Sequence, residues 1–236
     1  MRAQMSERPE PAIRFRPIRF AIVGFDLDGT LLDTAPDIAH ALNHALRAAG
    51  RPALSLDEVR PMIGGGAKKL LAKALGQGER VPEDELAPLY ALLLDHYAAH
   101  IAVETRAYDG LERALDALAE QGAVLGVATN KLEALAADLL GQMGLADRFA
   151  AIVGGDTLGT ERAKPLPDML HHMAKGCGGG TMAFVGDSAF DMKAARAAGV
   201  PGVAVSFGYP GMAVAALGAD RIIDHYDELL PVLAEL

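Results

Sequence analysis

Two aspartates spaced two residues apart, Asp26 and Asp28, follow a short apolar segment, residues 19–24, and precede Gly29 and Thr30. Carboxylates with this spacing on an extended backbone share one face. The pair would therefore lie beside a tight turn, where one carboxylate can attack a phosphorus atom and the other can transfer a proton. Carboxylate oxygens also attract a hard divalent cation. Asp-Gly is equally an ordinary turn signal, so the pattern alone leaves a polar turn as an alternative.

Polar residues that follow later apolar segments can complete such a site. A hydroxyl and backbone amides near a helix start bind phosphate oxygens, and a lysine neutralises an attacking carboxylate together with a phosphate. Two further aspartates would complete an oxygen site for Mg²⁺ with Asp26 and the backbone carbonyl of Asp28. The residues with these properties are Thr129, Asn130, Lys164, Asp187 and Asp191.

From Tyr108 onward, apolar segments typical of strands alternate with segments typical of helices, and these elements must position the polar residues. The predicted helices are 133–143, 168–175 and 190–198. The predicted strands are 123–128, 151–153, 182–185, 203–205 and 221–223, together with the earlier strand at 19–24. Apolar strands separated by helices indicate a parallel sheet covered on both faces. We therefore predict an α/β fold with a doubly wound, mostly parallel, Rossmann-like sheet. Such sheets bind ligands at the carboxyl ends of their strands, where the polar residues converge.

The segment between the first and second strands has a different character. Apolar residues recur at helical spacing in 38–46, and Ser55 and Glu58 have capping-box spacing. Further helices are predicted at 67–75 and 82–101, and the segment shows no convincing strand pattern. We predict a helical domain inserted at 36–105, a core of residues 19–35 and 106–236, and a flexible tail at 1–18.

Composition excludes several classes of protein. The 31 acidic and 22 basic residues give a net charge of -9, which offers no electrostatic footprint for nucleic acid or an anionic membrane. Charges or glycines interrupt every long apolar run, and the basic N-terminal segment lacks the apolar core of a secretory signal, with Met5 as an alternative start. We expect a soluble, cytoplasmic protein, either a monomer or a homodimer.

The single cysteine, Cys177, excludes an intrachain disulfide and fits a reducing compartment. Glycines surround it and no base lies beside it in the sequence, so we interpret it as a loop thiol and not a nucleophile. The histidine pairs His40 with His44 and His96 with His100 have the spacing of metal ligands on a helix. Neither pair has a clear third ligand, and we favour packing or surface roles over a zinc site.

The chain resembles the haloacid dehalogenase superfamily at four motifs in order, from about Arg19 to its end. Bacterial phosphoglycolate phosphatases are the most similar members, and they carry a helical cap between the first two motifs. The motifs are Asp26-x-Asp28, Thr129, Lys164-Pro165 and Gly186-Asp187-Ser188-x-x-Asp191. The segments that resemble the phosphoglycolate phosphatases are 25–38, 108–110, 129–131, 154–156 and 208–209.

The resemblance implies a role for each motif residue. Asp26 is expected to form an aspartyl-phosphate, and Asp28 to protonate the leaving alcohol and then deprotonate water. Thr129 and Lys164 would hold the phosphoryl oxygens, while Asp187 binds Mg²⁺ and Asp191 supports that site. Many relatives have Asn where this chain has Phe190, a difference expected to alter hydrogen bonding around the metal.

Substrate choice is expected to lie in the inserted domain. Residues 64–66 are three glycines, and Lys68 and Lys69 follow them, so a loop with positive charge could receive a small carboxylate beside the phosphate. A glycine-rich helix start is also a common structural device. The predicted substrate-binding residues are Gly29, Thr30, Asn130, Gly65, Gly66 and Lys68.

These features favour a Mg²⁺-dependent phosphatase for a small phosphorylated acid, with 2-phosphoglycolate as the leading substrate. A sugar-phosphate phosphatase, a pyrophosphatase or a phosphomutase of the same superfamily remains an alternative. A noncatalytic phosphate-binding protein is the alternative from another class. Asp28 disfavours a dehalogenase, and the absence of a Walker loop and of a nucleophile elbow disfavours a nucleotide-binding P-loop and a serine hydrolase.

Overall fold

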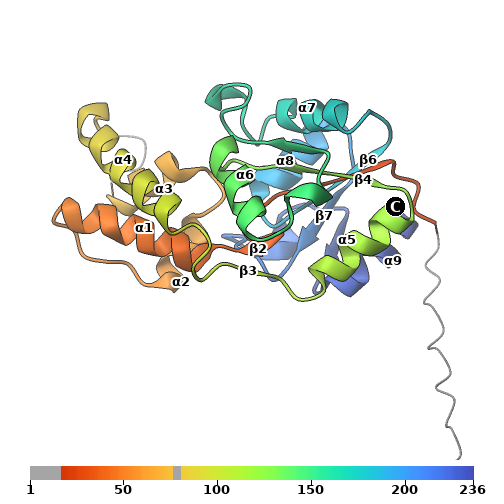
Figure 1. The fold of residues 1–236 in the computed structure, drawn as a ribbon, viewed down its shortest axis with the longest axis horizontal. Helices are drawn as coiled ribbons and strands as arrows, with labels where there is room; N and C mark the ends of the chain where they lie inside the picture. Colours follow the sequence, from red (N-terminus) through yellow and green to blue (C-terminus); the bar gives the residue numbers. More distant parts are fainter. Residues whose placement is uncertain (1–16, 77–80) are drawn as a thin grey trace, which may run out of the picture.

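A computed structural model describes residues 17–76 and 81–236, and most of the predicted tail, including Met5, lies outside the described residues. Its main sheet has six parallel strands in the order β5-β4-β1-β6-β7-β8. Helices lie around this sheet (Figure 1). This sheet confirms the predicted α/β fold. Its strands are β1 (Ile22–Phe25), β4 (Val124–Ala128), β5 (Ala151–Val153), β6 (Met182–Gly186), β7 (Gly202–Val205) and β8 (Arg221–Ile223).

Helices cover both faces of the sheet because its strands are apolar on both sides. Val23 of β1 packs in the cluster that contains α5 (Leu111–Glu120) and α9 (Leu229–Glu235), whereas the neighbouring Ile22 packs with α7 (Asp168–Gly176). Successive side chains thus point to opposite faces, as strand geometry requires. The remaining core helices are α6 (Glu133–Gln142) and α8 (Ala189–Ala198).

β1 occupies the position in the sheet where the chain reverses its direction of winding. It pairs with β4 on one side and with β6 on the other, both parallel. The strand ends one residue later than predicted, and the amide of Asp26 still donates to the Val185 carbonyl at 2.9 Å. Asp26 therefore leaves the ladder at the carboxyl edge, where open α/β sheets bind ligands.

Among the described residues of the insertion there are four α-helices, and they lie to one side of the sheet (Figure 1). They are α1 (Ala35–Ala48), α2 (Leu56–Val59), α3 (Ala67–Ala74) and α4 (Glu83–Ala99), with a 3₁₀ turn at Arg60–Met62. The predicted capping box is present, since Ser55 accepts from the Glu58 amide and Glu58 accepts from the Ser55 amide. We propose that residues 36–105 form a cap domain. Its first helix, α1, begins one residue before the predicted boundary, at Ala35.

A short antiparallel ribbon, absent from the sequence predictions, joins the cap to the core. Its strands are β2 (Leu32–Asp33) and β3 (Arg106–Ala107). Two-residue strands are too short to show an alternating pattern. Next to them, the buried carboxylate of Asp37 accepts from the amides of Glu104 and Thr105 at 2.9–3.0 Å. The two connections between the domains are thereby held side by side.

Cys177 differs from its interpretation as a loop thiol. It caps the C-terminus of α7 and is buried against the sheet, with its Sγ 3.7 Å from the Leu125 carbonyl oxygen. Burial raises the pKa of the thiol.

Within residues 17–76 and 81–236, no helix has both the length and the apolar character needed to cross a membrane.

Candidate active site

The buried side chains of Asp26 and Lys164 lie at the centre of the site. Lys164 Nζ is 2.9 Å from Asp26 Oδ1 and 2.6 Å from Asp191 Oδ1. Burial raises the pKa of Asp26 to about 6, although Lys164 partly opposes this shift. Burial alone would lower the pKa of Lys164, but Asp191 and Asp26 outweigh it and raise that pKa. The lysine therefore remains a cation beside the carboxylates.

Three buried aspartates converge from the ends of β1 and β6 and from the first turn of α8. Asp26, Asp187 and Asp191 each offer a carboxylate oxygen, and these oxygens lie within 4.8 Å of one another. Burial and the neighbouring Asp191 and Asp26 raise the pKa of Asp187 well above its ordinary value. A single lysine leaves this group with an excess of negative charge. An oxygen-only, negatively charged donor set of this kind fits Mg²⁺.

The turn at Gly29 and the loop that contains Tyr209 both contact Asp187 beside the end of β1. Gly29 has a φ of 80°, and a Cβ at this position would lie 2.3 Å from Asp187 Oδ2, so only glycine permits the approach. The amide of Tyr209 donates to the same oxygen at 2.6 Å. The Tyr209 hydroxyl also contacts Asp33 and accepts from the Ala35 amide at 3.0 Å. Tyr209 thus links the acidic cluster to the start of the cap.

Asp191 is engaged through both of its carboxylate oxygens. Oδ1 pairs with Lys164, whereas Oδ2 accepts from the Ser188 amide at 2.9 Å and from the Ser188 hydroxyl at 2.6 Å. These contacts form a capping box at the start of α8. Asp191 therefore fixes the position of Lys164.

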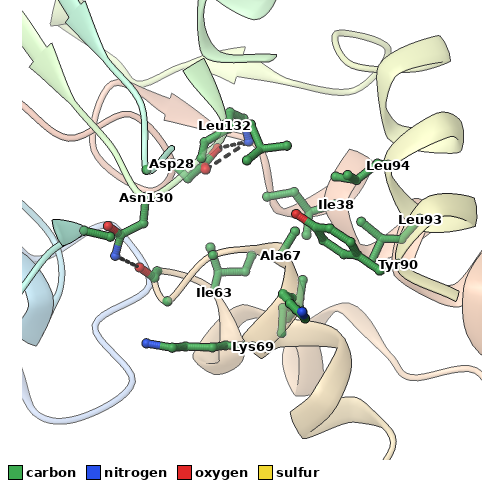
Figure 2. A pocket seen from close by; sticks show the side chains of 18 of the residues that line it. Asp28, Ile38, Ile63, Ala67, Lys69, Tyr90, Leu93, Leu94, Asn130 and Leu132 are labelled. Carbon is green, nitrogen blue, oxygen red and sulfur yellow. Dashed lines mark hydrogen bonds and ion pairs between the residues drawn. The ribbon is translucent and has the colours of Figure 1, made fainter. Parts of the chain in front are cut away.

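Thr129 and Asn130 follow β4, but they have different surroundings. Thr129 is buried and lines the cavity described below. The Asn130 side chain donates to the carbonyls of Gly64 and Lys164 at 2.9 and 3.1 Å and accepts from the Lys164 amide at 3.0 Å (Figure 2). The Asn130 side chain therefore ties the cap loop and the Lys164 connection to the core.

Lys131 is a site residue that the sequence predictions did not assign. Its Nζ lies 2.8 and 2.9 Å from the two carboxylate oxygens of Asp28, and its side chain is only 6% exposed. The ammonium also lies 4.5 Å from the centre of the Tyr97 ring of α4. Its place directly after Thr129 and Asn130 was the available sequence signal. The partner, 103 residues away, could not be identified from sequence.

The glycine loop lies against the core, and Lys68 is paired with Glu83. Gly66 has a φ of 90°, and a Cβ there would lie 3.3 Å from the Asn130 carbonyl oxygen. Lys68 Nζ is 2.7 Å from Glu83 Oε1, and both side chains are largely exposed.

Phe190 has no polar side-chain atom that could hydrogen-bond to the acidic cluster. Its ring lies near Gly65 and 5.8 Å from Lys69 Nζ.

A cavity of about 730 Å³ separates the cap from the core. Asp26, Asp28, Thr129 and Lys164 contribute polar groups, whereas the cap contributes a mostly apolar wall (Figure 2). The apolar residues of the cap include Ile38, Ile63, Tyr90, Leu93 and Leu94, and Leu132 adds an apolar side chain from the core.

Gly29 and Thr30 do not line this cavity in the described structure. Thr30 is fully buried, and its carbonyl accepts from the Tyr226 hydroxyl at 2.7 Å. The substrate contacts expected of both residues stay predictions. Gly65, Gly66 and Lys68, in contrast, are part of the cavity wall.

His44 of one pair and both histidines of the other come together between α1 and α4, whereas His40 Nδ1 lies 3.7 Å from Glu104 Oε1. The His96 ring lies 4.5 Å from that of His44 and 4.4 Å from that of His100, measured between centroids. Among the described residues, the aspartate cluster is the only group of three or more such ligands with suitably close donor atoms. His44, His96 and His100 thus pack against one another in the cap.

The arrangement is that of an α/β enzyme with an inserted helical domain and an acidic cluster at the carboxyl edge of its sheet. A family model described as haloacid dehalogenase-like hydrolase matches residues 23–205. The chain belongs to this family, and it is therefore a hydrolase.

Relatives with assigned names are similar over almost the whole chain. A phosphoglycolate phosphatase of Agrobacterium fabrum is 40% identical over 216 residues, covering 89% of this chain and 91% of the relative. An N-acetylmuramic acid 6-phosphate phosphatase of Pseudomonas aeruginosa is 39% identical over 219 residues, covering 92% and 96%. The crystal structure of a predicted phosphoglycolate phosphatase from Haemophilus somnus has a TM-score of 0.81 at 29% identity, covering 91% and 98%.

Proposed function

We propose that this hydrolase is a Mg²⁺-dependent phosphatase that cleaves a phosphorylated acid, most directly 2-phosphoglycolate, into its alcohol and phosphate. The observation that carries the proposal is the buried Asp26–Lys164 pair at the cavity, surrounded by Asp187 and Asp191. A carboxylate held by a fixed cation is positioned to attack a phosphorus atom, while the same cation offsets the charge of the phosphate.

In the first step, an oxygen of Asp26 forms a bond to phosphorus and the ester P–O bond breaks. Asp28, at the cavity wall, delivers a proton to the departing alkoxide. In the second step, Asp28 takes a proton from water as the water oxygen attacks the aspartyl-phosphate. Phosphate then leaves and Asp26 is restored. Thr129 and Lys164 orient the phosphoryl oxygens in both steps.

Asp26, the backbone carbonyl of Asp28 and Asp187 would hold Mg²⁺, and Asp191 would support it through Lys164. Bound Mg²⁺ supplies positive charge that stabilises the phosphoryl group during transfer. The protein's own contribution is to keep three carboxylates close together in a buried site.

Names of relatives support the choice of 2-phosphoglycolate, since several relatives at about 40% identity are phosphoglycolate phosphatases. The size of the cavity favours a second candidate, N-acetylmuramic acid 6-phosphate. A volume of about 730 Å³ with an apolar wall lies in the range of drug-sized ligands and exceeds what a two-carbon acid needs. One relative of this chain is named for that substrate.

The test is phosphate release with Mg²⁺ from 2-phosphoglycolate, N-acetylmuramic acid 6-phosphate, hexose phosphates, nucleotides and pyrophosphate. We expect the highest kcat/KM with a phosphorylated acid and loss of activity in Asp26→Asn. Preference for pyrophosphate or a neutral hexose phosphate would reject the substrate class. Isomer exchange of a sugar phosphate without phosphate loss would indicate a mutase, and specific binding without turnover of any ester would indicate a noncatalytic protein.

A further inference from the structure

The cavity contains a buried cation that the phosphatase chemistry described above does not use. Lys131 Nζ is bonded to both oxygens of Asp28, at 2.8 and 2.9 Å. An ammonium group has three N–H donors, so this pair of bonds leaves one donor for another acceptor. Lys131 also lines the cavity, next to the carboxylate that must reach the leaving oxygen.

A second polar group at this place comes from the cap. Tyr97 of α4 is 4% exposed and lines the same cavity. Its hydroxyl is buried and has no hydrogen-bond partner among the described residues. A buried hydroxyl without a partner is costly unless a ligand or water completes it. The ring of Tyr97 lies against Lys131, so the two unused donors belong to one region of the site.

Geometry determines which part of a substrate reaches this region. The ester oxygen must come within about 2.6–3.2 Å of Asp28 to receive its proton. Lys131 is bonded to that same carboxylate, so it lies beside the first atoms of the leaving group. A carboxylate attached to the ester carbon, as in 2-phosphoglycolate, would therefore lie within reach of Lys131.

The other lysines of the cavity wall are less suited to this task. Lys164 is occupied by Asp26 and Asp191. Lys68 is paired with Glu83, and its side chain is 49% exposed. Lys69 and Lys73 are exposed residues of α3. Because screening by water weakens exposed charges, a buried ammonium discriminates more strongly between a charged and a neutral leaving group.

We propose that Lys131, assisted by the Tyr97 hydroxyl, forms the subsite that binds the carboxylate of the leaving alcohol. This inference rests on the proposed phosphatase function and assigns its selectivity for phosphorylated acids to a core residue, in place of the cap lysines. Both domains contribute to the subsite, since Tyr97 belongs to the cap and Lys131 to the core.

The experiment compares 2-phosphoglycolate with ethyl phosphate, which has the same chain length and no carboxylate. In the wild type, kcat/KM should favour 2-phosphoglycolate by at least about 10-fold, the scale of one charged hydrogen bond. Lys131→Met should reduce this ratio by about 10- to 100-fold, and Lys131→Arg should retain more of it. Tyr97→Phe should reduce it less than Lys131→Met. Lys175→Met, an exposed lysine of α7, should leave the ratio unchanged.

Glycolate binding provides a readout that does not depend on turnover. Calorimetry should show glycolate binding to the wild type in the presence of Mg²⁺ and phosphate, and weaker binding to Lys131→Met. Equal losses on both esters in Lys131→Met would overturn the inference, because they would show an effect through Asp28 alone. If no ester is hydrolysed, the proposed function fails, and the inference then stands or falls on whether Lys131→Met weakens glycolate binding.

Discussion

Lys164 and Asp26 form an ion pair in which Nζ and Oδ1 are 2.9 Å apart and the two side chains are 1% and 5% exposed. The lysine comes from the connection after β5 and the aspartate from the end of β1. Because the pair is almost fully removed from water, each charge depends on the other. The structure thus places a cation and a carboxylate in fixed contact at the edge of the sheet.

Replacing Lys164 should damage both activity and stability. Lys164→Met leaves Asp26 and Asp191 without their shared cation, and loss of one partner from a buried pair costs about 3–5 kcal/mol. We expect a decrease in kcat of at least about 100-fold, the scale for losing one group that stabilises a transition state. Urea unfolding and phosphate release measure the two effects, with Lys175→Met as the exposed control. Wild-type activity in Lys164→Met would contradict the assigned role.

Mg²⁺ should stabilise the folded protein through the aspartate cluster. Binding to the native state alone adds about 2.7 kcal/mol at a Mg²⁺ concentration 100 times the Kd. Thermal unfolding should therefore shift to higher temperature with Mg²⁺ and return with a chelator. In Asp187→Asn the shift should be much smaller, whereas Asp147→Asn, at an exposed position, should respond like the wild type. An equal Mg²⁺ shift in Asp187→Asn would place the cation elsewhere.

The acids could be placed from the sequence because their positions follow from the strand ends. Once β1, β4 and β6 are recognised as parallel strands, Asp26, Thr129 and Asp187 must meet at one edge. The helical insertion was also recognisable, since its helices have regular apolar spacing and α2 has a capping box.

The features that the sequence did not reveal depend on distances between remote segments. Lys131 contacts Asp28, which lies 103 residues away in the sequence, and the sequence pattern of neither segment indicates this contact. Lys68 was expected over the substrate, but Glu83 of the next helix is close enough to pair with it. Cys177 has glycines around it in sequence, yet the end of α7 packs it against the sheet.

Gly66 should be more sensitive to substitution than Gly50, which also has a positive φ. Gly66 and Gly50 have φ values of 90° and 66°, so Gly66→Ala and Gly50→Ala both introduce backbone strain of about 1 kcal/mol or more. At Gly66 the new methyl also meets the Asn130 carbonyl oxygen at 3.3 Å, whereas Gly50 faces open space. Steady-state kinetics should show a higher KM in Gly66→Ala than in the wild type, and an unchanged KM in Gly50→Ala. Equal KM values in both variants would argue against tight contact between cap and core.

The histidine cluster predicts a dependence of stability on acidity. Burial, followed by the neighbouring His44 and His100, lowers the pKa of His96 from its ordinary value of 6.5. The unfolded chain therefore binds this proton at a higher pH than the folded chain does. The free energy of unfolding should fall as pH decreases through 6.5 toward the lower pKa of the folded state.

Urea unfolding at several pH values measures this decrease. His96→Gln should make the curve flatter over the same range, because it removes the group that titrates. His172→Gln, an exposed residue of α7, is the control. A curve for His96→Gln as steep as that of the wild type would exclude His96 as the source.

The nucleophile assignment is tested most directly by trapping the phosphorylated enzyme. A single turnover with 2-phosphoglycolate and Mg²⁺ is stopped with acid after milliseconds, and mass spectrometry then locates the phosphoryl group. We predict modification of Asp26, and none in Asp26→Asn, which should also release no phosphate. A phosphoryl group on another residue, or phosphate release by Asp26→Asn at the wild-type rate, would contradict the account.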